Sequence, residues 1–181
     1  MNINDLNELG VRSNKVLGFE LMDLMKMPYL FIKETLVEQI ANMQSETFVS
    51  EEMLMENIRL IVRSVIDKNN ITDKQYNNVS DSVVLSLFFH INDQLSELLQ
   101  LEQDHLQSTP DAILLQAGVM RLNQLGEMVT LMNLSKGDYF LAKKLGQEPY
   151  EDIFWLLSYN LISNDIERKV NEITSKRNVH K

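Results

Sequence analysis

The chain has 181 residues, of which 44% are hydrophobic and 24% are charged, the composition of an ordinary globular protein. It contains no Cys, which excludes disulfides, thiolate catalysis and cysteine-ligated zinc or iron–sulfur sites. With 17 Lys and Arg against 26 Asp and Glu, its formal charge of −9 argues against general binding to nucleic acid or to anionic membranes.

The sequence carries no signal for export or membrane insertion. The first residues include acids but no Lys or Arg before Arg12, and no apolar segment of the kind found in signal peptides follows them. The longest apolar run, over residues 83–89, is far shorter than the roughly 18 residues that a membrane span needs. We therefore expect a cytoplasmic protein without a membrane partner.

Apolar residues recur at intervals of three and four, while Gly and Pro are scarce, and this pattern predicts an all-α fold. In the first part of the chain, the predicted helices cover residues 3–9, 14–27, 28–44 and 51 to about 67–70. Pro28 interrupts the second of these helices and suits the first turn of the third. Ser50 is the predicted N-cap of the fourth helix, because acids that the helix dipole favours follow it directly.

Capping signals continue in the rest of the chain. Thr72 and Gln75 form a capping-box pattern that opens the next helix. Further helices are predicted over residues 79–106, 109–133, 135–146 and 149–176. The first of these carries the longest apolar stripe in the chain, formed by Val84, Phe88, Ile91, Leu95 and Leu98. The helix over 109–133 is apolar on several sides, so we expect it to be the central one.

These elements predict a single-domain helical bundle of about seven to eight helices with short connections, spanning residues 1–181. A division near residues 69–78 is the alternative, because that polar stretch is the longest break in the apolar pattern. We expect the polar tail over residues 174–181 to fray.

One local pattern has the spacing of half a metal site. Glu102 and His105 stand three positions apart on a predicted helix, so their side chains share a face, as in di-iron bundles. Such sites need two Glu-x-x-His motifs, and we find only one here. Glu102 and His105 are therefore candidate ligands, although we expect no metal and no cofactor. Motifs for phosphate loops, zinc proteases and hydrolase nucleophiles are missing, so we expect no catalytic residues.

Residues 134–162 have the outline of a helix-turn-helix, with Gly146 at the turn. The candidate phosphate-binding side chains are Lys136, Lys143 and Lys144. The second helix begins with the acids Glu148, Glu151 and Asp152, which phosphates would repel. A DNA- or polymerase-associated transcription or replication factor is therefore the alternative hypothesis.

Aromatic residues gather near the start of the last predicted helix. Trp155 and Tyr159 share one of its faces, while Tyr150 and Phe154 belong to another. Two interpretations stay open for Trp155 and Tyr159. One is burial in the core, where a lone Trp usually lies, and the other is an exposed anchor for a partner protein.

The central part of the chain is acidic. No Lys or Arg occurs between Lys74 and Arg121, and the six acids in that stretch account for −6 of the net charge of −9. This pattern fits either a solvated helix face or a surface that attracts a basic partner.

The candidate partner-binding residues are Trp155, Tyr159, Tyr150, Glu97 and Asp93. The leading hypothesis is a non-enzymatic protein-binding factor, either an adaptor or a chaperone-like, inhibitory or regulatory protein, that docks a basic partner through a helix face. Homodimerisation through the helix over 79–106 is a second expectation, although its stripe would equally serve as the core of one chain. A metal-binding bundle protein is the last alternative.

Overall fold

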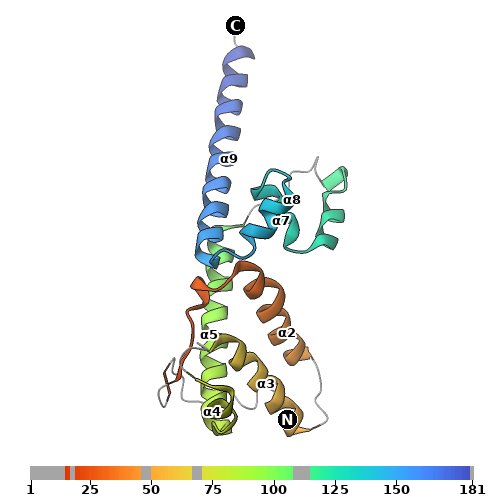
Figure 1. Cartoon of the computed structure of the whole chain (residues 1–181). Helices are drawn as coiled ribbons and strands as arrows, with labels where there is room; N and C mark the ends of the chain where they lie inside the picture. The colour runs from red at the N-terminus through yellow and green to blue at the C-terminus, as the bar shows by residue number, and fades with distance from the viewer. Residues whose placement is uncertain (1–14, 17–18, 46–49, 67–70, 108–114, 180–181) are drawn as a thin grey trace.

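The computed structural model describes residues 15–16, 19–45, 50–66, 71–107 and 115–179, and Figure 1 shows their arrangement. Helices dominate these residues, so the predicted all-α class is confirmed. The buried side chains form one hydrophobic core cluster that extends along the sequence from Leu21 to Phe154. The predicted segment over 3–9 lies outside the described residues. Among the described helices, none combines the length and apolar character that crossing a bilayer requires.

The predicted helix over 14–27 is wrong. Two-residue strands occupy part of this range, β1 (Lys15–Val16) and β2 (Phe19–Glu20), and they pair antiparallel. The chain then stays extended at Met22, whose backbone N–H donates to the carbonyl of Val65 over 2.9 Å. A 3₁₀ turn, η1 (Leu24–Lys26), follows and is capped by the Asp23 side chain. Hydrogen bonds to a distant segment have replaced the internal ladder that an α-helix would form.

The helix predicted over 28–44 is confirmed, with an unusual first half. Its backbone is a π-helix, η2 (Phe31–Leu36), which passes directly into α2 (Val37–Ser45). The buried residues of this unit are Ile32, Leu36, Ile40 and Met43. They recur every three or four positions, so one face of the whole unit packs on the core.

The next two helices begin where their caps predict. In α3 (Glu51–Val65), the Ser50 side chain accepts from the backbone N–H of Met53. In α4 (Asp73–Asn77), Thr72 and Gln75 form the complete capping box. Tyr76 is buried in the shared core, which ties the polar stretch 71–78 to the rest of the chain.

The central helix is α5 (Asp81–His105), which Figure 1 shows beside α3 and in line with the last helix. The five residues of its predicted stripe are all buried inside the chain: Val84, Phe88, Ile91, Leu95 and Leu98. The stripe is therefore the core seam of one chain, and it is not available for the expected pairing of two copies.

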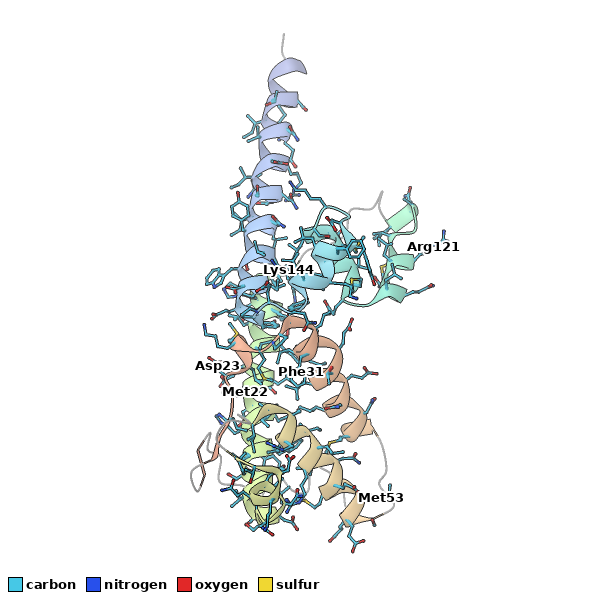
Figure 2. All side chains as sticks on the ribbon, in the orientation of Figure 1. Met22, Asp23, Phe31, Met53, Arg121 and Lys144 are labelled. Carbon is cyan, nitrogen blue, oxygen red and sulfur yellow. The ribbon has the colours of Figure 1, made fainter. Side chains whose placement is uncertain are left out.

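The helix predicted over 109–133 is not continuous and is not central. The structure describes its range from residue 115 and shows a 3₁₀ segment, η3 (Val119–Leu125), followed by the short helix α7 (Met128–Leu134). Gly118 has φ +85° and Gly126 has φ +56°, values that break an α-helix and that glycine adopts without strain. Most of η3 is exposed, and Figure 2 shows Arg121 at its outer edge.

The last two helices are α8 (Tyr139–Leu145) and α9 (Tyr150–Val179). The N-cap of α8 is Asp138, which accepts from the backbone N–H groups of Phe140 and Leu141. The helix predicted over 135–146 therefore begins after Asp138 and not at Ser135, whose hydroxyl donates to the carbonyl of Met132. Beyond its base, α9 stands clear of the other elements (Figure 1) and extends through most of the tail that was expected to fray.

Candidate functional site

An exposed apolar face runs along α9. Starting at Trp155, large apolar residues follow one another at intervals of four, three, four, four and three positions. At 3.6 residues per turn, this spacing places all of them on one side of the helix. We call them the α9 stripe: Trp155, Tyr159, Ile162, Ile166, Val170 and Ile173. Each is between 53% and 69% exposed. Figure 2 shows that the outer part of α9 extends beyond the body, with side chains on both of its sides.

The base of α9 is fixed in the body by buried aromatic residues. Tyr150 stacks on Tyr29, with ring centroids 5.7 Å apart, and its backbone N–H donates to the carbonyl of Met27 over 2.8 Å. Ile153 and Phe154 are buried beside it. This anchored first turn sets the direction in which α9, and with it the α9 stripe, leaves the body.

A charged network beneath α9 completes this anchor. The Tyr150 hydroxyl donates to Glu102 Oε1 over 2.5 Å, and Lys33 Nζ donates to Glu102 Oε2 over 2.7 Å. Glu127 accepts from the Tyr29 hydroxyl over 2.7 Å and lies 3.7 Å from Lys33 Nζ. One ammonium and two tyrosines thus satisfy two carboxylates, and the network joins η2, α5, α7 and α9.

Both tyrosines of this network are held in their neutral form. Burial raises the pKa of Tyr29 well above its usual range, and the charge of Glu127 raises it further. Burial likewise raises the pKa of Tyr150, and the hydrogen bond to Glu102 adds to the effect. Since each hydroxyl keeps its proton at physiological pH, each remains a hydrogen-bond donor to its carboxylate.

A cleft of about 840 Å³ opens above the network, between α5, α7 and α9. Its charged lining is Lys33, Glu102 and Glu127, and leucine and carboxamide side chains line the walls. These three charged groups already pair with one another and with the two tyrosines. The network therefore holds the helices together.

Of the two candidate metal ligands, only Glu102 lines this cleft. Glu102 is bound to Lys33 and Tyr150. His105 is exposed, with its ring against Phe154 at a centroid distance of 6.1 Å. Within the described ranges, no three His, Asp or Glu side chains come together as a metal site would require. Glu102 and His105 stay candidate ligands from the sequence alone, and their geometry gives no further support to metal binding.

The predicted partner-binding residues fall in three different places. Trp155 and Tyr159 are exposed on the α9 stripe, in agreement with the anchor interpretation and not with core burial. Tyr150 has no exposed area, so it cannot contact a partner directly. The prediction that places it on a partner-binding surface is therefore corrected, and Tyr150 belongs to the anchor of α9. Glu97 is exposed and Asp93 half-buried, both on α5 and not beside the stripe residues on α9.

The outer half of the stripe was not predicted from the sequence. Ile162, Ile166, Val170 and Ile173 continue the spacing that begins at Trp155, and extending that spacing along the helix would have found them. A second exposed group lies on α8, where Tyr139, Phe140 and Leu141 are adjacent in sequence. Phe140 is 83% exposed, the largest fraction among the exposed large hydrophobic residues of the described ranges.

The helix-turn-helix outline is present, but its second helix is not presented to a groove. Residues 134–162 include α8, the turn at Gly146 and the base of α9, and the candidate lysines are all exposed: Lys136, Lys143 and Lys144. The first turn of α9 is anchored by Tyr150, and Glu151 pairs with Lys26. A recognition helix must offer its first turn to bases, and this one offers acids and buried aromatics.

Comparisons of the chain with family models, with curated proteins and with solved structures find no match.

Proposed function

We propose that this chain is a non-enzymatic protein-binding factor that contacts its partner through the α9 stripe. The observation that supports the proposal is the continuous exposure of six large apolar side chains on one helix face. Such a stripe exposes on the order of 600 Å² of apolar surface, the upper end of what monomeric proteins leave uncovered. Contiguous patches of this size mark contacts with other proteins.

The composition and setting of the stripe support the same function. Trp and Tyr, which provide much of the binding energy in protein interfaces, occupy its inner end at Trp155 and Tyr159. The anchor at Tyr150 holds this end in place, so little conformational freedom is lost on binding. The partner would lay an apolar helix or groove along the stripe.

Quantitative affinity capture with purified tagged protein tests this proposal. The protein as purified is compared with Ile166→Glu, which places a charge within the stripe, and with Asn171→Glu, which adds the same charge on the opposite face of α9. We expect capture of a stoichiometric partner protein to fall at least tenfold in Ile166→Glu, because a carboxylate is costly to bury unpaired. We expect it to persist in Asn171→Glu.

Far-UV circular dichroism of both variants serves as the control for folding. Residues 166 and 171 are exposed, so neither substitution removes a core contact and both variants should keep the helical signal. Equal capture by the two variants would contradict the proposal, since the added charges differ only in which face of α9 they occupy.

A further inference from the structure

The residues of α9 indicate which kind of partner binds the α9 stripe. We infer that it is a second copy of this chain, so that α9 pairs with α9 along the stripe. This inference rests on the proposed function and names the occupant of the same surface. Three observations support it: the helix needs a packing partner, the stripe has the form of a two-helix seam, and the outer part of α9 carries no net charge that would repel a second copy.

The outer part of α9 is a poor helix on its own. Between residues 160 and 175, it is rich in Asn, Ser, Thr, Ile and Val, all of which have low helix propensity. No core contact compensates, since every residue from 166 to 176 is exposed. Isolated helices of this length are marginal in water even with better sequences. Packing along the stripe would supply the missing stabilisation.

The stripe has the form of a seam between two helices. Trp155 and Ile173 are 18 positions apart, or about 27 Å at a rise of 1.5 Å per residue. Apolar residues at alternating intervals of three and four form the contact line of paired helices, with knobs from one helix between residues of the other. The mean repeat of 3.6 residues keeps this line straight, so two such helices can pair along their whole length.

The balance of charge on the outer part of α9 suits a copy of the same chain. From Trp155 to Lys176 the helix carries three acids and three bases, namely Asp165, Glu167, Glu172, Arg168, Lys169 and Lys176, and is therefore neutral. Acids and bases are interspersed along the helix, and Asp165 forms ion pairs with both Arg168 and Lys169. A two-fold interface must be complementary to itself, which a neutral surface of mixed charge satisfies. A basic partner would gain nothing here, since the excess acids of the chain lie elsewhere.

Sedimentation velocity and light scattering across a wide range of concentration test the inference. We expect the full chain to form a species of twice its 21.0 kDa mass, and Asn171→Glu to behave alike. Ile166→Glu should raise the dissociation constant at least 100-fold, because each copy would bury an unpaired carboxylate in the seam in either orientation. A dimer that persists in Ile166→Glu would overturn this inference, because the two copies would then meet at another surface, and the proposed function would still be decided by the affinity capture described above.

A monomer at every concentration would overturn the inference alone. Affinity capture of a different protein, lost in Ile166→Glu, would then leave the proposed function standing. The two failures are therefore distinguishable, because one is read from the mass of the purified chain and the other from binding to a foreign protein.

Single cysteines locate the contact directly, because the chain contains no Cys of its own. Disulfides need Cα atoms within about 7 Å, so only residues facing each other across the seam will link. Parallel pairing links Ile166→Cys to itself, and antiparallel pairing over the full stripe links it to Ile162→Cys in a mixture of the two variants. Asn171→Cys, on the opposite face, should not link. Linking of Asn171→Cys as fast as Ile166→Cys would contradict pairing along the stripe.

Discussion

Removing one hydroxyl from the anchor of α9 gives a direct test of how this helix is held. Tyr150→Phe deletes the hydrogen bond to Glu102, a charged acceptor at 2.5 Å, while keeping the ring that stacks on Tyr29. Hydrogen bonds to charged groups contribute about 1.5–3 kcal/mol each. Glu102 is partly exposed and keeps Lys33 as a partner, so the loss should lie at the lower end, about 1.5–2 kcal/mol.

Tyr139→Phe is the matched control, since it removes the same atom from an exposed tyrosine outside the α9 stripe. We expect it to change the free energy of unfolding by less than about 0.5 kcal/mol. Urea unfolding followed by circular dichroism measures both variants at one fixed protein concentration, and an unchanged m-value identifies a true change in stability. Equal midpoints for the two variants would refute the argument that the Tyr150–Glu102 bond anchors α9.

A double-mutant cycle sharpens the same prediction. If the bond is the cause, Tyr150→Phe should cost much less in a Glu102→Gln background than in the original chain, because the charge that strengthens the bond is already gone. A cost that is the same in both backgrounds would place the effect in the packing of the ring instead.

Three further predictions concern the same region. Gly146→Ala should lower stability by about 1–3 kcal/mol, because the added Cβ would lie 2.4 Å from Leu30 Cδ1, and thermal unfolding measures this. Ile153→Ala, at a fully buried site, should cost about 2–5 kcal/mol in urea unfolding. Above pH 10, unfolded tyrosines lose protons that Tyr29 and Tyr150 retain in the fold, so stability should fall as pH rises. This decline should be shallower in a variant with Phe at both positions, measured by unfolding at successive pH values.

Sequence patterns correctly predicted those helices whose start or buried face depends on residues within the helix itself. Ser50 and Thr72 act through side chains that bond within three positions, so the sequence alone contains the cause. The stripe of α5 is regular enough to require one buried face, and the structure buries it. These successes share a local origin.

The errors arise where distant contacts or backbone conformation decide. The apolar spacing over 14–27 suits a helix, but hydrogen bonding of Met22 to Val65 favours an extended chain. Over 109–133 the spacing is also helical, yet Gly126 adopts a positive φ that interrupts an α-helix. A glycine within a helical pattern can lie inside a helix or can end it, and the pattern alone does not tell which.

The anchor could not be predicted from sequence at all. Its members Tyr29, Lys33, Glu102, Glu127 and Tyr150 come from four separate elements, and no spacing relates them. Only the inner end of the α9 stripe was predicted, since Trp155 and Tyr159 were expected to share one face of the helix. Periodicity tells which residues share a face, but whether that face meets the core or the solvent depends on what the fold places beside it.

The two ends of α9 serve two separate purposes, and this separation makes the proposals testable. At the base, apolar side chains such as Ile153 and Phe154 point inward and hold the helix on the body. After Leu161, the same side of the helix becomes polar, with Asn164 and Arg168, and apolar residues continue only on the opposite face. A substitution at Ile153 should therefore lower the stability of the chain, whereas one in the stripe should lower association and leave the fold intact. A helix that served the core alone would have no reason to extend an apolar face beyond its last buried turn.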